Sequence, residues 1–234
     1  MPEEFRKTPP APLAPIPFQI PQPFETLLEN GLRIIIFENK RLPIVNFRLA
    51  FRFGEINSPN NTRGLSSAVA SLLTQGTKNY SSKELAEKVE NLGASLHASS
   101  SSDNTTISAS ALAMYRAEIL KLMAEILFKP TFPEDELKLY KENTIKGLEF
   151  QRSQADFLAD EQSARIIYGT HPYSKVAPKP ADVEEISRDS LIEFHSQKMI
   201  PNNAMLIVVG DVNRDEILDE LNQIFGDWKH GNVE

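Results

Sequence analysis

The sequence predicts an α+β fold, with a mostly antiparallel sheet and helices packed on one face of it. Two strand-like segments come early in the chain, and a β-hairpin turns near residue 103. Four helical segments then separate that hairpin from a last apolar strand at 204–212. Strands that alternate in polarity favour antiparallel pairing with one wet face, and helices grouped between them favour a helical layer on the other face.

Length and composition place the chain among globular proteins. Of its 234 residues, 41% are hydrophobic and 24% are charged, which is ordinary for a chain that buries a core. The net charge of −7 argues against a nucleic-acid or anionic-membrane partner. No apolar run approaches the roughly 18–20 residues that span a bilayer. No signal-peptide core follows Met1, so the location is left open between the cytoplasm, the default, and the periplasm, if a signal has been removed.

Side chains for covalent or metal chemistry are scarce. The chain has no cysteine, which excludes disulfides, thiol nucleophiles and cysteine-based metal sites. Its four histidines are scattered, at His97, His171, His195 and His230, and argue against a histidine-rich metal site. We expect His97 at the surface, on the polar face of a strand, and His171, which precedes a proline, to hold a turn. Neither a G-x-S-x-G nucleophile elbow nor a P-loop is present.

The first 23 residues differ from the rest of the chain. They hold eight of the sixteen prolines, a composition typical of extended polyproline II structure. We expect residues 1–23 to be a proline-rich extended arm that acts as a stiff tether or lies over a domain. A ligand for an aromatic-lined groove is the alternative. Residues 24–234 are expected to form a single α+β domain.

The expected elements follow from apolar periodicity. Residues 32–37 and 45–53 are predicted to be strands that pair antiparallel, and residues 94–102 and 105–111 to be a hairpin with a serine-rich wet face. The run at 204–212 is apolar throughout and predicts a strand buried on both faces or placed centrally in the sheet. Further helices are predicted at 83–92, 114–127, 134–152, 155–168, 188–198 and 214–225.

The most informative segment is a short helix expected within residues 64–77. One stripe of it is apolar: Leu65, Val69, Leu72 and Leu73. The opposite face carries only small, uncharged side chains: Ser67, Ala70, Ser71 and Thr74. A smooth face of this kind usually packs closely on a neighbouring element. Residues 60–62 are predicted to supply turn and cap chemistry, and Gly76 to end the helix as a C′ glycine.

The residues around this helix carry a family resemblance. Gly64-Leu65 begins it, Leu72-Leu73-x-x-Gly76-Thr77 ends it, and Tyr80-Ser81-Ser82-Lys83-Glu84-Leu85 follows. The pattern resembles the metal-site helix of the inverzincins, the insulinase, pitrilysin and mitochondrial processing peptidase family, whose signature is H-x-x-E-H. The resemblance covers roughly residues 24–228, which is nearly the whole chain.

This resemblance maps the family's site onto five positions of the chain. The two histidine ligands fall on Ser67 and Ser71, and the general-base glutamate falls on Ala70. The third zinc ligand of the family, a glutamate on a later long helix, matches Glu149, and an acidic residue two turns before it matches Glu142. The three positions of the H-x-x-E-H motif have therefore lost the family's residues.

The three replacements remove the family's chemistry. Bound zinc lowers the pKa of a water molecule from about 15.7 to about 7, but a serine hydroxyl stays protonated near neutrality and is a poor zinc ligand. An alanine methyl cannot accept the proton of that water. The resemblance therefore implies a peptidase fold with no catalytic residue, no metal site and no cofactor of its own. Zinc is expected only in a catalytic partner.

The resemblance also implies a function. We expect a non-catalytic subunit or half-subunit of a zinc peptidase, which helps to form a chamber for a peptide substrate with an active H-x-x-E-H paralogue or a second half-domain. A full family subunit usually holds two such halves, and this chain corresponds to the N-terminal one. A stand-alone scaffold or interaction protein with the same fold is the alternative. A third hypothesis is an active metalloendopeptidase with a displaced metal site, against which the four scattered histidines argue.

Overall fold

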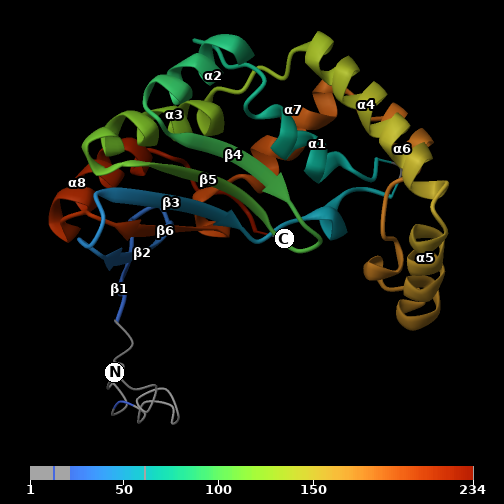
Figure 1. Ribbon diagram of the computed structural model, residues 1–234, viewed down its shortest axis with the longest axis horizontal. Coiled ribbons are helices and arrows are strands. Elements are labelled where there is room, and N and C mark those ends of the chain that lie inside the picture. Colours follow the sequence, from blue (N-terminus) through green and yellow to red (C-terminus); the bar gives the residue numbers. More distant parts are fainter. Residues whose placement is uncertain (1–12, 14–21, 61, 234) are drawn as a thin grey trace, which may run out of the picture.

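A six-stranded sheet lies at the centre of the fold, and the computed structural model describes residues 13, 22–60 and 62–233 (Figure 1). The strands lie side by side in the order β1-β2-β6-β3-β5-β4. All neighbours are antiparallel except β2 and β6, which confirms the mostly antiparallel sheet. The predicted proline-rich arm falls almost wholly outside the described residues. The strands are β1 (Phe24–Leu27), β2 (Arg33–Glu38), β3 (Ile44–Phe51), β4 (Ser95–Ser100), β5 (Thr105–Leu112) and β6 (Ala204–Gly210).

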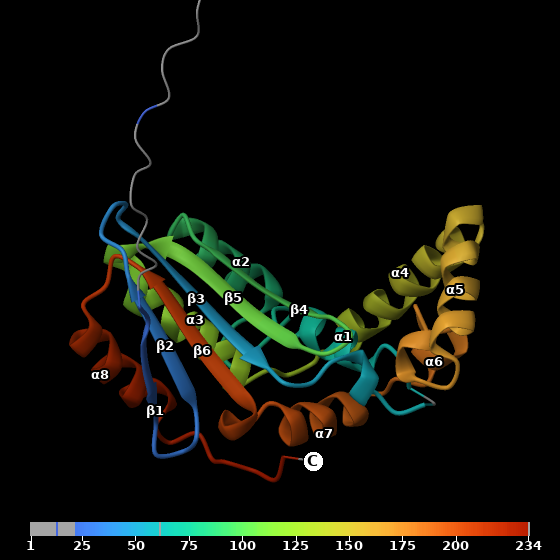
Figure 2. The same cartoon turned by 90° about the horizontal axis from the view of Figure 1, so that it is seen from below.

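Helices cover one face of this sheet, as the sequence predicts (Figures 1 and 2). Of the eight, α2, α3 and α8 lie over that face, whereas α4, α5 and α6 stand beyond one end of the sheet. No helix in the described part of the chain is long and apolar enough to cross a membrane. The helices are α1 (Leu65–Leu72), α2 (Ser82–Asn91), α3 (Arg116–Phe128), α4 (Glu134–Arg152), α5 (Ala155–Tyr168), α6 (Pro180–Glu184), α7 (Arg188–Lys198) and α8 (Arg214–Phe225).

The prediction that the first two long strands pair with each other is wrong. β6 lies between them, parallel to β2 and antiparallel to β3, so that Val208 is flanked by Ile36 on one side and Phe47 on the other. A short connection between two strands favours a hairpin, but a strand that is apolar throughout is best buried in the middle of a sheet. The central placement predicted for 204–212 is therefore confirmed. Only one face of β6 is fully buried, because its alternate residues, such as Ile207, are half-buried on the open face.

The side chains of β3 that face the helices begin the core. Alternate residues along this strand and just beyond it are at most 1% exposed, which confirms the predicted alternation: Val45, Phe47, Leu49, Phe51 and Phe53. They share one cluster with buried residues of α3 and α8, including Ile119, Met123, Ile217, Leu221 and Phe225. The Trp228 ring lies 5.5 Å from that of Phe128 and 6.1 Å from that of Phe51. The segment after α8 is thereby packed onto both α3 and the sheet.

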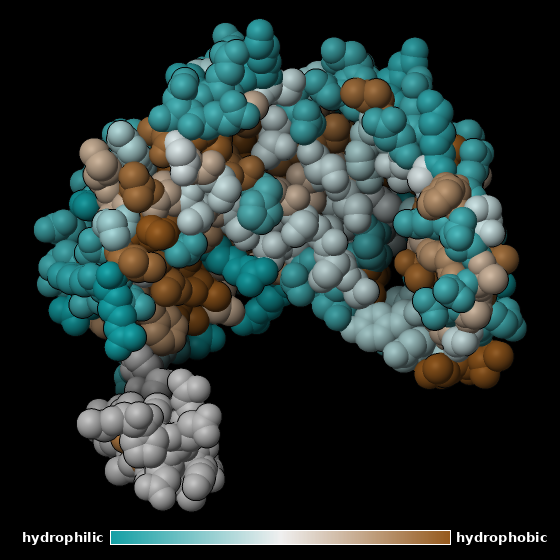
Figure 3. All heavy atoms as spheres, viewed as in Figure 1, coloured by the Kyte–Doolittle hydropathy of each residue, from teal (hydrophilic) through white to brown (hydrophobic). Residues whose placement is uncertain are grey.

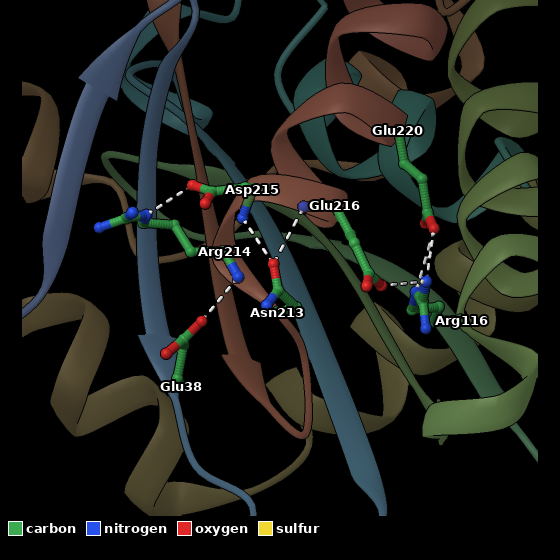
Figure 4. A network of polar contacts seen from close by, with 7 residues as sticks. All are labelled: Glu38, Arg116, Asn213, Arg214, Asp215, Glu216 and Glu220. Atoms are coloured by element: carbon green, nitrogen blue, oxygen red, sulfur yellow. Dashed lines mark hydrogen bonds and ion pairs between the residues drawn. The ribbon is translucent and has the colours of Figure 1, made fainter.

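Polar contacts tie the start of α8 to α3 (Figure 4). The Asn213 side chain accepts hydrogen bonds from the backbone N–H groups of Asp215 and Glu216, and so caps α8. Arg116, at the start of α3, forms ion pairs with Glu220 at 2.8 Å and with Glu216 at 3.2 Å. The hydrogen bonds that Arg116 donates to the Glu220 carboxylate raise the pKa of the guanidinium above its usual value. Helices α3 and α8 are therefore joined by ion pairs from the first residue of α3 as well as by apolar packing.

Some local features differ from the sequence prediction. Gly76 is not the C′ residue of α1, which ends at Leu72. Instead Gly76, with φ +156°, pairs with Ser81 in an isolated β-bridge, and a Cβ at its position would lie 2.9 Å from the Cγ of Pro133. The glycine therefore permits close approach of the segment that leads into α4. β1 and α6, with four and five residues, are too short to show a periodic pattern in the sequence.

Substitution of Gly210, the last residue of β6, tests how closely the backbones of β6 and β3 approach each other. Its φ is +144°, and a Cβ there would lie 2.1 Å from the carbonyl oxygen of Ile44. We expect Gly210→Ala to lower the free energy of unfolding by more than ~3 kcal/mol, because the clash is with backbone at the centre of the sheet. Urea denaturation measures the change.

Gly147→Ala is the matched control for this variant. Gly147 lies inside α4, and a Cβ there would meet nothing within 4 Å. The substitution should raise the free energy of unfolding by about 0.5–1 kcal/mol, because alanine is the better helix former. Similar small effects of the two substitutions would contradict the close approach of β6 and β3.

Candidate functional site

Helix α1, on which the resemblance places the family's motif, is packed against edge strand β4, α7 and α4. Its apolar stripe is buried as predicted, with Leu65, Val69, Leu72 and Leu73 at most 2% exposed. On the side of the hairpin, the Ser66 hydroxyl oxygen lies 2.7 Å from that of Ser100 and 3.2 Å from that of Thr105. Buried hydroxyl groups thus join α1 to β4 and β5, because a buried polar group needs a partner.

The N-terminus of α1 is held by a carboxylate from outside the predicted cap. Gly64, the N-cap residue, has φ +90° and no side chain to offer. Instead, the two carboxylate oxygens of Glu55 accept hydrogen bonds from the backbone N–H groups of Gly64 at 3.0 Å and Ser67 at 2.7 Å. The Ser58 hydroxyl accepts from the N–H of Ser66 at 3.1 Å. A negative charge is favourable at this end of a helix.

The prediction that residues 60–62 supply the cap side chains is therefore corrected. The Asn60 side chain faces Arg63 and Lys175 instead, Asn61 lies outside the described residues, and Thr62 contributes its carbonyl oxygen to the N–H of Leu65. The sequence contains no local signal for Glu55 as the cap, because this residue precedes the helix by about ten positions and its carboxylate is brought back by the intervening turn.

The positions that match the family's site lie on two helices in contact. On α1, Ser67 is half-buried, Ala70 is 1% exposed and Ser71 is exposed. On α4, Glu142 and Glu149 are exposed, and neither side chain is ion-paired within the described residues. The contact between α1 and α4 brings the two sets of positions to the same part of the fold.

No group of three or more histidine, cysteine, aspartate or glutamate side chains in residues 22–60 and 62–233 could hold a metal ion. Three of the histidines lie on separate elements, where one is exposed and two form hydrogen bonds with the backbone. His97 is exposed on β4, as predicted, opposite Ser108. The Nδ1 of His171 accepts a hydrogen bond from the backbone N–H of Tyr173 at 3.2 Å, and the two rings lie 4.6 Å apart. His171 therefore holds its turn, as the sequence predicts.

His195 joins α7 to α3. Its Nε2 lies 2.9 Å from the carbonyl oxygen of Leu127, so this nitrogen carries the hydrogen. Burial lowers the pKa of the imidazole, against a smaller opposing effect of the bond to Leu127. The ring is thus neutral at physiological pH and acts as a structural donor.

Tyr140, on α4, is a partly buried ionisable group that is influenced by the charge of Glu55. Burial raises the pKa of its hydroxyl to about 12, the hydrogen bond with Thr144 opposes the rise, and the charge of Glu55 adds to it. The phenol therefore stays protonated at physiological pH and cannot serve as a base. Sequence reasoning did not single out Tyr140 or Glu55, because their environment arises from the contact of α4 with the turn before α1.

Comparison with known families identifies the fold. The model of the insulinase family, peptidase family M16, matches residues 33–179, and the model described as the peptidase M16 inactive domain matches residues 185–234. The chain belongs to peptidase family M16. The family resemblance read from the sequence is therefore confirmed. The two matched segments form one sheet, because β6 from the second segment lies between β2 and β3 from the first.

Several M16 relatives are similar to the chain over most of its length. It is 27% identical over 190 residues to the non-peptidase homolog YmxG of Helicobacter pylori, covering 81% of this chain and 44% of that protein. It is 22% identical over 202 residues to the uncharacterized zinc protease YmxG of Bacillus subtilis, covering 86% and 49%. It is 24% identical over 209 residues to the human mitochondrial-processing peptidase subunit beta, covering 89% and 42%. The chain thus spans about half the length of these curated relatives.

Solved M16 structures share the fold. A peptidase M16 inactive domain from Pseudomonas fluorescens superposes with a TM-score of 0.86 at 26% identity, covering 91% of this chain and 52% of that one. The first half of the periplasmic protease PqqL from Escherichia coli superposes with a TM-score of 0.78 at 20% identity, covering 90% and 47%. The α+β layer of this chain is therefore the M16 half-domain fold.

Removal of the Glu55 carboxylate tests its role at the start of α1. We expect Glu55→Ala to lower the free energy of unfolding by about 1–2 kcal/mol, because two backbone donors and one hydroxyl lose their acceptor. Glu142→Ala is the control, since this glutamate is exposed on α4, and its effect should stay within about 0.5 kcal/mol. Chemical denaturation of both variants measures the difference, and equal effects would show that Glu55 is not a cap.

The lowered pKa of the His195 imidazole predicts that the stability of the fold depends on pH. As the pH falls through the usual histidine value of about 6.5, the unfolded chain takes up a proton at this residue while the folded chain resists it. The unfolded state then binds more protons, so the free energy of unfolding should fall with falling pH. Denaturation midpoints between pH 7.5 and 5 should show a shallower fall in His195→Gln than in wild type. His97→Gln, at the surface, should keep the wild-type slope, and a wild-type slope in His195→Gln would refute the assignment.

Proposed function

We propose that this chain is a non-catalytic half-subunit of an M16 zinc peptidase, which forms part of the wall of a peptide-binding chamber together with an active partner or a second half-domain. The observation that carries the proposal is the pairing of an M16 half-domain fold with Ser67, Ala70 and Ser71 where the family has H-x-x-E-H. The description of one relative as a non-peptidase homolog supports the same conclusion.

The chemistry of the altered positions supports a non-catalytic role. Two histidines four residues apart on one face of a helix can grip one zinc ion, whereas hydroxyl groups at these positions keep their protons. Ala70 has no group that could accept a proton from water. Glu149 alone, exposed on α4, would supply a single oxygen ligand. The half-domain would then contribute a contact surface to the peptidase, and no catalytic group.

The open face of the sheet offers such a surface. The strand register places half-buried apolar side chains of β2 and β6 side by side on it, with Ile35 beside Ile207 and Phe37 beside Val209. On β4 and β5 the same face carries hydroxyl groups, such as those of Ser99 and Thr106. Figure 3 shows hydrophobic side chains over the β2 and β6 region and paler, more polar ones over β4 and β5. A face of this mixed kind suits contact with a peptide and with a partner domain.

Helix α5 offers a second surface for a partner. Ile166 and Ile167, adjacent near its end, are 74% and 72% exposed. Single exposed apolar residues are ordinary, but a group of them on a helix that stands away from the sheet is typical of a contact surface.

A stand-alone scaffold or interaction protein is the second candidate. Edge strand β4 favours it, because among the described residues β5 is the only strand that pairs with it, although α1 packs beside it. An open edge can accept an extended segment of another chain through backbone hydrogen bonds. The experiment below separates the two candidates by whether the partner is a peptidase.

The first test combines zinc analysis with peptide cleavage. The purified chain, an H-x-x-E-H paralogue from the same genome and their mixture are assayed on one peptide set. We expect no stoichiometric zinc and no cleavage with this chain alone, and more cleavage in the mixture than the paralogue gives by itself. One zinc per chain after dialysis would refute the proposal. A mixture no more active than the paralogue, with no complex in sedimentation, would favour the scaffold.

A restored variant gives this test its positive control. Ser67→His, Ala70→Glu and Ser71→His together should bind about one zinc per chain if the positions map as the resemblance implies. Adding Glu149→Gln should then weaken zinc binding at least 10-fold, because a ligand is lost. Adding Glu134→Gln instead, at the far end of α4, should leave zinc binding unchanged.

A further inference from the structure

A cleft of about 320 Å³ lies between α5, the end of α4, the segment before α6 and the turn before α1. Figure 2 shows these elements grouped beyond the end of the sheet. Five of the side chains that line the cleft are basic and two are acidic, although the whole chain carries a net charge of −7. The basic ones are Arg63, Arg152, Arg165, Lys175 and Lys179.

Two of these arginines hold buried donors that have no acceptor. The Nε of Arg63 and the Nη1 of Arg152 are buried and without a hydrogen-bond partner in the described part of the chain. The other contacts of Arg152 are complete: its Nη2 donates to Glu161 at 2.9 Å and to the carbonyl oxygen of Pro178 at 2.9 Å. A buried donor left unpaired costs about 1–3 kcal/mol. The interior beside the cleft therefore holds more guanidinium donors than acceptors within the described residues.

The acidic residues of the cleft do not neutralise it. One carboxylate oxygen of Glu161 is engaged by Arg152, and the Asp182 carboxylate accepts from the backbone N–H of Lys179. Within the described residues, the Lys175 ammonium group donates to the neutral Asn60 side chain, at 3.3 Å, and forms no ion pair. Arg165 is exposed at the mouth and makes no ion pair with a described residue. Positive charge therefore remains at both the base and the rim.

The position of the cleft is set by close packing on α1. Gly64 begins that helix, and a Cβ there would lie 3.3 Å from the Cγ of Pro178, whose carbonyl oxygen holds Arg152. The same short stretch before α1 carries Arg63. The base of the cleft is therefore built from backbone and side chains that the fold holds in place, which is the condition for a selective polar site.

We propose that this cleft binds an oxyanion of the phosphate or carboxylate class. Guanidinium groups present planar pairs of donors that match the oxygens of both ligands, and the lysines add charge. The oxyanion pairs with the guanidinium groups of Arg63 and Arg152, and with the side chains of Arg165 and Lys175, all of which line the cleft. This site requires no zinc and no partner chain, and it is separate from the positions that match the family's metal site.

Isothermal titration of the full chain with inorganic phosphate, and separately with citrate, tests the proposal at constant ionic strength. We expect saturable binding at one site per chain for at least one of the two anions. Tighter binding of phosphate assigns the site to phosphate groups, and tighter binding of citrate assigns it to carboxylates. Absence of saturable binding of both anions would overturn the proposal.

Rim variants locate the binding without disturbing the base of the cleft. Arg165→Gln and Lys175→Gln should each weaken binding about 10-fold, a change of about 1.4 kcal/mol, with an unchanged thermal midpoint. Arg41→Gln is the matched control. Arg41 is exposed in the turn after β2, and its substitution removes the same charge away from the cleft. Equal weakening by Arg41→Gln would show a general charge effect and would also overturn the proposal. Zinc content and peptide cleavage do not enter this test, so its failure leaves the proposed function unaffected.

Discussion

The insertion of β6 between β2 and β3 is the contact on which the rest of the structure depends. The backbone of β6 pairs with β2 on one side and β3 on the other, although about 160 residues separate β6 from β3 in the chain. Until β6 is in place, the sheet consists of two pieces, a β1–β2 pair and a β3–β5–β4 unit. Leu206 and Val208, both at 0% exposure, then join the two pieces to one core. Strand β6 lies in the segment matched by the inactive-domain model, and it joins the two sheet pieces that come before it in the chain.

The helical layer follows from the closed sheet. α3 follows β5 and α8 follows β6, so both helices return over the same face and their buried side chains meet those of β3. α1 uses the remaining space beside edge strand β4, where small side chains allow it to approach closely. Its hold on the fold comes from Leu65 and Val69 inside, from the Ser66 hydroxyl group toward the hairpin, and from the Glu55 carboxylate at its start.

These anchors hold α1 in place without a contribution from the side chains of Ser67 and Ser71. None of the contacts that hold α1 in place requires a side chain at Ser71, which is exposed, or more than a methyl group at Ala70. Ser67 contributes its backbone N–H to Glu55, which any residue could do. The contacts that hold the helix therefore place little demand on the side chains of Ser67 and Ser71, whereas the buried Ala70 favours a small side chain.

The sequence by itself determined the elements and the family. Alternation along 45–53, the amphipathic helices and the frame around 64–77 are local patterns, so they could be read directly from the sequence. The mapping of the family's site onto Ser67, Ala70, Ser71, Glu142 and Glu149 stays a prediction from the resemblance. The pairing of β4 with β5 was predicted as a hairpin, but only the tertiary structure decided the partners of β2, β3 and β6, the cap of α1 and the cleft beside α5. Each of these depends on residues far apart in the chain, such as Glu38 beside Gly210 or Arg63 beside Lys175. Local periodicity records which face of an element is buried, but not which distant element covers it.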